Sequence, residues 1–124
     1  MSVPVDLAAL GAEVERAGDV AFLVTSAPDV RPHVVSVRLR FDDELLVMPA
    51  GRTSRRNAHA SPDVTVLWPG GPDYCLLVDG TAVVDDGMET VTVRPTGAIL
   101  HRLAGTAADL PYCVPLEPVR DGES

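Results

Sequence analysis

The sequence predicts a mainly β fold, in the form of a small closed or nearly closed barrel of six strands with about two short helices. Three observations support this class: strand-type apolar patterns recur in six segments, brief turn-rich connections separate them, and helical periodicity is confined to two short stretches. A chain of 124 residues suits one core. We therefore expect a single domain over 1–124, with its core at about 5–103 and an irregular, Pro-rich tail at 104–124.

The first element is a short amphipathic helix in the segment 6–18. Asp6 is a suitable N-cap, and Gly18 stands where a helix would end. Between them, apolar residues recur at helical spacing, at Leu7, Leu10, Val14 and Ala17. We expect this helix to pack one face on the barrel.

A β-hairpin follows, in which 20–26 and 31–41 are strands and "APDV" at 27–30 is the turn. Alternation in the second strand divides its side chains between two faces. The apolar face carries Val35, Val37, Leu39 and Phe41, and the polar face carries Ser36, Arg38 and Arg40.

The remaining elements are one helix and four strands. "DDE" at 42–44 leads into a third strand, "LLVMPA", and the segment "GRTSRRNAHA" then enters a short helix that Ser61 and Pro62 end. Strands at 63–68, 74–84 and 88–103 complete the set of six. Pro95 and Gly97 interrupt the last strand and predict a bend at a corner of the sheet.

Arginines gather in one part of an acidic chain. Residues 31–56 hold six arginines and three acids, a net charge of +3, whereas the remaining residues carry −11. A phosphate offers each guanidinium a charge-assisted partner, and Thr53 and Ser54 at a helix start add hydroxyl and N–H donors. The alternative is a capped surface helix and strand arginines that face water. Charge counting alone leaves both interpretations open.

Several classes of function are excluded or disfavoured. The net charge of −8 argues against nucleic acid or an anionic membrane as a partner. No apolar run is long enough to span a membrane and the N-terminus is acidic, so we expect a cytoplasmic protein. Cys75 and Cys113 lack metal-ligand spacing, and we expect no metal. The motifs of nucleophilic hydrolases, Rossmann proteins and P-loop proteins do not occur.

The order and spacing of these segments resemble the FMN-binding split-barrel family related to pyridoxamine 5′-phosphate oxidase. The resemblance covers roughly residues 5 to 100, and four motifs carry it: "RPHVVSV", "TSRRN", "SPDVTVLW" and "DGTA". It implies a Greek-key split barrel of six strands that forms a homodimer with flavin at the subunit interface. The implied function is that of an oxidoreductase that uses FMN, or the phosphate-bearing deazaflavin F-420, on a small-molecule substrate; no catalytic residue is implied.

The resemblance also implies which residues would bind the cofactor. Arg52, Ser54, Arg56 and Asn57 would hold the phosphate, with help from Thr53. His33, Val35, Ser36 and Val37 would line the ring and ribityl chain, and Met48, Pro49 and Ala50 would form the adjoining wall. Trp68 would either cover a flavin edge or lie in the core or dimer interface.

Two alternatives remain at this stage. Only "DDGM" separates the fifth and sixth strands, where larger relatives insert helices that build the substrate pocket. A non-catalytic protein that binds or carries flavin or haem is therefore the second hypothesis, and a barrel that binds nothing is the third. If a flavin is bound, it performs the redox step, and the protein need only bind, orient and tune it.

Overall fold

The computed structural model describes residues 2–69 and 73–102, so the predicted tail at 104–124, with Cys113, lies outside the described residues. The described part of the chain is mostly strand. Its elements in chain order are β1 Ser2–Pro4, the 3₁₀ helix η1 Leu7–Ala9, α1 Leu10–Ala17, β2 Val20–Ala27, β3 Val30–Arg38, β4 Arg40–Asp42, β5 Leu45–Pro49, α2 Arg52–Ala60, β6 Asp63–Trp68, β7 Tyr74–Asp85 and β8 Thr90–Arg102.

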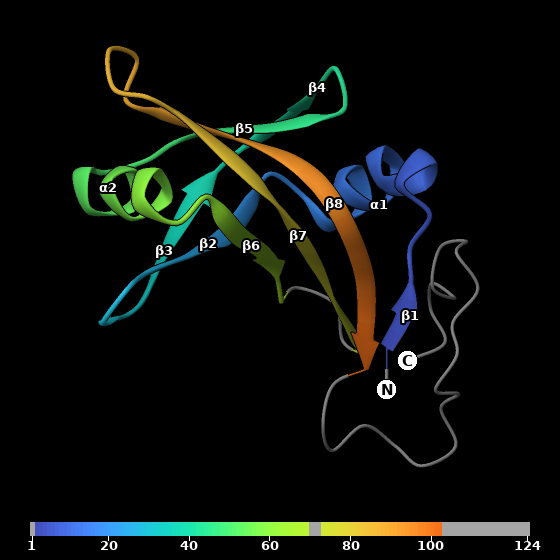
Figure 1. The fold of residues 1–124 in the computed structure, drawn as a ribbon. Helices are drawn as coiled ribbons and strands as arrows, with labels where there is room; N and C mark the ends of the chain where they lie inside the picture. Colours follow the sequence, from blue (N-terminus) through green and yellow to red (C-terminus); the bar gives the residue numbers. More distant parts are fainter. Residues whose placement is uncertain (1, 70–72, 103–124) are drawn as a thin grey trace.

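The strands form one antiparallel sheet with the order β3-β2-β6-β7-β8-β5-β4, and β1 also pairs with β8. Figure 1 shows this sheet curling into a half-barrel, with α2 and α1 on opposite sides of it. This arrangement confirms the predicted split barrel. The described residues contain eight strands, however, where the sequence predicted six.

The two additional strands have different origins. β1 is a short strand at the N-terminus, paired with Ile99, Leu100 and His101 of β8. β4 arises because the predicted strand 31–41 is interrupted at Leu39, whose side chain is buried and whose N–H donates to the Asp19 carbonyl oxygen at 2.7 Å. That bond is the last of the β2–β3 pairing, because β2 begins at Val20 opposite Arg38, and beyond it the chain pairs as β4 with β5.

The core lies on the concave side of the sheet and consists of alternate strand residues. Its largest fully buried side chains include Leu10 from α1, Leu23 from β2, Met48 from β5 and Trp68 from β6. Burial of each such side chain contributes roughly 1.5 to 3 kcal/mol to folding. The barrel interior is therefore filled by side chains and leaves ligands to its rims and outer surface.

The ends of the first helical segment follow the sequence signals. Asp6 accepts a hydrogen bond from the Ala8 N–H at 3.0 Å and so caps η1, which continues directly into α1. α1 ends before Gly18, whose φ of 103° suits glycine. Leu10 and Val14 face the core, as predicted, whereas Leu7 and Ala17 of the same predicted face are exposed.

The predicted bend in the last strand is a β-bulge. Asp79 of β7 pairs with Gly97, and the next residue, Gly80, pairs with Pro95, so Thr96 is the extra residue on β8. The Thr96 hydroxyl donates to the Asp79 carbonyl oxygen at 3.2 Å. Gly80 lies so close to β8 that a Cβ there would approach the Arg94 carbonyl oxygen to 2.5 Å.

Candidate functional site

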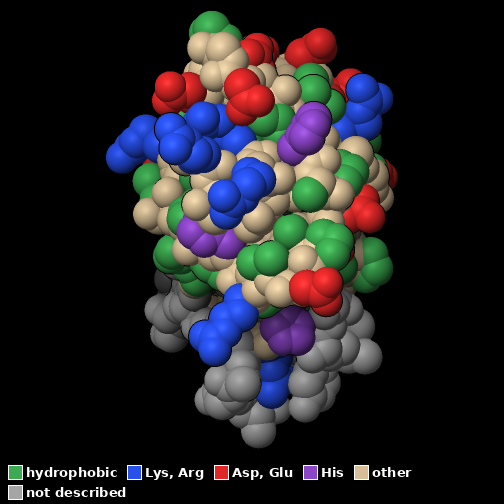
Figure 2. Space-filling model, turned by 60° about the vertical axis from the view of Figure 1, so that its left-hand side comes forward, with side chains coloured by type: hydrophobic (Ala, Val, Ile, Leu, Met, Phe, Trp, Pro, Cys, Tyr) green, Lys and Arg blue, Asp and Glu red, His purple; other side chains and the backbone are tan. Residues whose placement is uncertain are grey.

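Helix α2 separates the predicted phosphate-binding residues into a buried set and an exposed set. Ser54, Asn57 and Ala58 recur at helical spacing and face the core. Arg52 and Arg56 lie one turn apart on the opposite side and are exposed. Figure 2 shows arginine side chains gathered on the face of the molecule that carries α2, beside a group of carboxylates.

The N-terminus of α2 is open. Gly51 is its N-cap and supplies no side-chain cap, and the N–H groups of Arg52, Thr53 and Ser54 make no hydrogen bond to a described residue. A Cβ at Gly51 would meet nothing within 4 Å, so space in front of this helix end is free. Free N–H groups at a helix N-terminus, together with the helix dipole, favour an anion.

The six clustered arginines do not act as one group. Three of them form ion pairs within the described chain, at distances of 2.7 Å for Arg38 with Asp19, 3.9 Å for Arg40 with Asp42 and 3.1 Å for Arg55 with Asp86. Arg55 also donates to the Ala50 carbonyl oxygen at 2.6 Å, so its side chain joins the start of α2 to Asp86 in the β7–β8 turn. Arg31, Arg52 and Arg56 have no such partner among the described residues.

A buried hydrogen bond connects α2 to β2, which pairs with the edge strand β3. Asn57 Nδ2 donates to the Thr25 hydroxyl at 3.3 Å, and Thr25 pairs with His33 across β2 and β3. Paired residues of antiparallel strands point to the same side of the sheet, so His33 lies on the side of the sheet to which α2 is attached. His33 is half-buried and keeps part of its ring accessible.

No family model and no curated protein matches this chain. Solved structures do match it. A protein assigned as a pyridoxamine 5′-phosphate oxidase from Listeria innocua superimposes with a TM-score of 0.60 at 16% identity, over 73% of this chain and 97% of that one. The chain has the split-barrel fold of pyridoxamine 5′-phosphate oxidase-like proteins.

Two further structures share this split barrel. An F420 reductase matches at a TM-score of 0.52 and 24% identity, over 64% of this chain and 87% of that one. A FAD-binding protein from Mycobacterium smegmatis matches at a TM-score of 0.57 and 14% identity, over 83% of this chain and 99% of that one. At these identities the likeness concerns the fold.

On the split barrel, the thirteen predicted cofactor-binding residues fall into three groups. The exposed ones are Ser36, Pro49, Arg52 and Arg56; the half-buried ones are His33, Val35 and Thr53; the buried ones are Val37, Met48, Ala50, Ser54, Asn57 and Trp68. Ser36 points to the opposite face of β3 from Val35, because neighbouring strand residues alternate. Val35 therefore lies on the side of the sheet that carries α2, and Ser36 lies on the outer face.

Trp68 lies in the core. It is 1% exposed, and its Nε1–H donates to the Gly18 carbonyl oxygen at 3.0 Å, which joins the end of β6 to the end of α1. Of the two sequence interpretations, the structure favours the core residue. A ligand could contact the indole only after part of the core had moved.

Other titratable groups add little to this site. Cys75 is half-buried on β7, and burial raises the pKa of its thiol. Among the described residues no group of His, Cys, Asp and Glu side chains could hold a metal ion. No helix in the described part of the chain is long and apolar enough to cross a bilayer.

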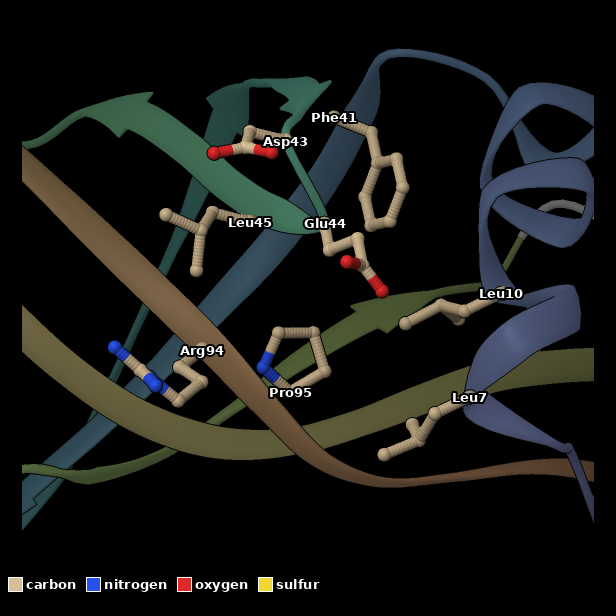
Figure 3. A pocket seen from close by; sticks show the side chains of 8 residues that line it. All are labelled: Leu7, Leu10, Phe41, Asp43, Glu44, Leu45, Arg94 and Pro95. Atoms are coloured by element: carbon tan, nitrogen blue, oxygen red, sulfur yellow. The ribbon is translucent and has the colours of Figure 1, made fainter.

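Sequence reasoning missed a pocket on the other side of the half-barrel. It has a volume of about 410 Å³, and its wall contains none of the predicted cofactor-binding residues (Figure 3). The lining residues come from η1, α1, the β4–β5 hairpin and β8: Leu7, Leu10, Phe41, Asp43, Glu44, Leu45, Arg94 and Pro95. They lie far apart in the sequence, and no local motif brings them together.

Proposed function

We propose that this chain binds a phosphate-bearing flavin-type coenzyme, FMN or the deazaflavin F-420, and acts as an oxidoreductase. The observation that carries the proposal is the open N-terminus of α2 beside Arg52 and Arg56, two arginines without an ion-pair partner among the described residues. The fold supports it, since structures named F420 reductase and FAD-binding protein share the barrel.

The residues at this helix end fit a phosphate. Arg52 and Arg56 supply charge-assisted donors, and the Thr53 hydroxyl and the N–H groups of the first turn supply neutral ones. Ser54 and Asn57 lie on the buried side of α2, and Asn57 fixes α2 on β2 through its hydrogen bond to Thr25. In this proposal Ser54 and Asn57 position the phosphate donors and make no side-chain contact with the phosphate.

The rest of the cofactor would extend along β3 and the adjoining end of β5. His33 and Val35 offer a half-buried edge, and Met48 and Ala50 support the adjoining wall from the core, with their backbone as the part that can face a ligand. The bound coenzyme supplies the hydride chemistry. The chain supplies charge neutralisation at the phosphate and an apolar surface that excludes water from the ring.

A homodimer would pack on the outer face of the sheet and would meet this site at the edge strand β3. Phe22, Leu67, Leu77 and Ile99 follow one another across β2, β6, β7 and β8 on the outer face of the sheet, and all are half-buried. Val34 on β3 is 55% exposed on the same face. A continuous apolar surface of this kind is typical of an interface between subunits.

Purification followed by an absorption spectrum in the near-ultraviolet and visible range is the first test, because both coenzymes absorb there. FMN is then titrated into the apoprotein and into Arg52→Ala, Arg56→Ala and the control Arg40→Ala, which removes an exposed arginine on β4. Loss of one charge-assisted contact should weaken FMN binding about tenfold or more in the first two variants and leave the control unchanged. Equal affinity in all three variants contradicts the phosphate site.

A non-catalytic carrier of flavin or haem is the second candidate. It is favoured by the connection between β7 and β8, which is a turn at 86–89 where a larger substrate pocket would need an insertion. Anaerobic mixing of the loaded protein with NAD(P)H or reduced deazaflavin and an electron acceptor separates the two candidates. Steady oxidation of the reductant supports the enzyme, and binding without turnover supports the carrier.

A further inference from the structure

The pocket beside α1 combines an apolar floor with charged side chains at its rim. Leu10 forms part of the floor and is 1% exposed, whereas Leu7 at the mouth is 42% exposed. Phe41 stands opposite them, packed so closely on α1 that a Cβ at Gly11 would lie 3.1 Å from its ring. Glycine at position 11 therefore leaves room for the Phe41 ring, which forms one wall of the pocket.

Three charged residues line the same space without neutralising one another. The side chains of Asp43, Glu44 and Arg94 form no hydrogen bond or ion pair with another described residue. Figure 3 shows the Glu44 carboxylate turned toward Leu10 and Phe41, and the Arg94 guanidinium directed away from it along β8. The apolar part of the pocket therefore faces the Glu44 carboxylate, and the Arg94 guanidinium lies away from that carboxylate.

The β4–β5 turn keeps these carboxylates at some cost in backbone energy. Asp43 and Glu44 have φ angles of 51° and 65°, the left-handed conformation at both central positions of a two-residue hairpin. Asn-Gly is the sequence preferred in such a turn, because β-carbons are strained at positive φ. Aspartate tolerates this conformation, whereas Glu44 stands where glycine would be preferred.

From these observations we propose that the pocket binds a small organic ammonium ion with an apolar tail. The ammonium group would lie between the Glu44 carboxylate and the Phe41 ring, where ion pairing and a cation–π contact both favour it. The tail would cover Leu7, Leu10 and Pro95. A volume of about 410 Å³ lies in the usual range for small-molecule sites. This site is separate from the α2 surface and does not depend on the proposed flavin binding.

The probes are phenethylamine and 3-phenylpropionate, which share an aromatic tail and differ in the sign of the charge. Each is titrated into the protein by NMR, with chemical-shift changes followed for residues 41–45 and 94–95. We expect phenethylamine to shift these signals at millimolar concentration and 3-phenylpropionate to bind about tenfold more weakly. No shift with phenethylamine, or stronger binding of the carboxylate, overturns the proposal.

Variants locate the binding. Glu44→Gln should weaken phenethylamine binding about tenfold. Glu89→Gln is the matched control, since Glu89 is an exposed acid with a positive φ in the β7–β8 turn, outside the pocket. Leu7→Arg should abolish binding, because it places a cation of the chain itself at the mouth of the pocket. Equal affinity in Glu44→Gln and Glu89→Gln contradicts the site even if phenethylamine binds elsewhere.

Discussion

A substitution at Asn57 can distinguish a structural role of this residue from a role in binding the cofactor. Its side chain is 2% exposed beneath α2, and its Nδ2 donates to the Thr25 hydroxyl, which is itself 1% exposed. The resemblance to flavin-binding barrels implies that Asn57 contacts the cofactor phosphate. The structure implies that Asn57 fixes the helix on the sheet. Asn57→Ala distinguishes the two, because it should lower the free energy of unfolding and leave flavin affinity nearly unchanged.

The size of the effect follows from the buried hydroxyl. Removing Asn57 leaves the Thr25 hydroxyl without its partner, which costs about 1 to 3 kcal/mol. Alanine is the better helix former and recovers about 0.5 kcal/mol. The net loss is therefore roughly 0.5 to 2.5 kcal/mol, and for a chain of this length each kcal/mol lowers the melting temperature by roughly 4 °C.

Urea unfolding followed by the fluorescence of Trp68, the single tryptophan, measures this loss. A double-mutant cycle with Thr25→Val should give a coupling energy of about 0.5 kcal/mol or more between the two side chains. FMN titration of the folded variant should show less than about a threefold change, against about tenfold for Arg56→Ala. Unchanged stability together with a fall in affinity as large as that of Arg56→Ala would refute the structural role.

Two further predictions concern β7. Gly80→Ala should destabilise the protein by about 1 to 3 kcal/mol, because the new Cβ would meet the Arg94 carbonyl oxygen at 2.5 Å. Gly97→Ala at the same bulge has open space and should be neutral or slightly stabilising. Urea unfolding compares the two variants, and equal losses of stability would contradict the close packing at Gly80. In the Cys113→Ser variant, the Cys75 thiol should react slowly with iodoacetamide near neutral pH and faster once the chain is unfolded. Burial raises the pKa of this thiol in the folded state, so the unfolded thiol ionises at lower pH. Equal alkylation rates in the folded and unfolded states would show that burial does not protect this thiol.

Strand boundaries were predicted best where an alternating pattern stands between turn residues. β6 begins and ends at the predicted residues, 63–68, and β7 extends the predicted 74–84 by one residue. The break at Leu39 could not be predicted, because apolar alternation continues through it while the pairing partner changes there from β2 to β5. Local pattern cannot report a partner that only the tertiary fold brings near.

For the candidate site too, local sequence predicts the helix but not which of its side chains are accessible. A short helix that ends at Ser61 follows from local sequence, whereas its buried face of Ser54, Asn57 and Ala58 and its uncapped start at Gly51 do not. Which side chains remain accessible does not follow, since Ser54 and Arg56 are two residues apart and lie on opposite sides of the helix. The pocket beside α1 was missed because its walls meet only when β8 crosses the β4–β5 hairpin.

Arginine density in the sequence therefore overstates the positive charge available to a ligand. Asp19 and Asp86 lie outside the arginine-rich segment, and in the folded chain they pair with Arg38 and Arg55. What remains at α2 is a pair of guanidinium groups one turn apart, which repel each other unless solvent or an anion screens them. An anion held there gains from both cations and from the free helix end, whereas the rest of this acidic protein repels it. Affinity for phosphate should accordingly depend on this one surface, and the net charge of the chain should oppose it.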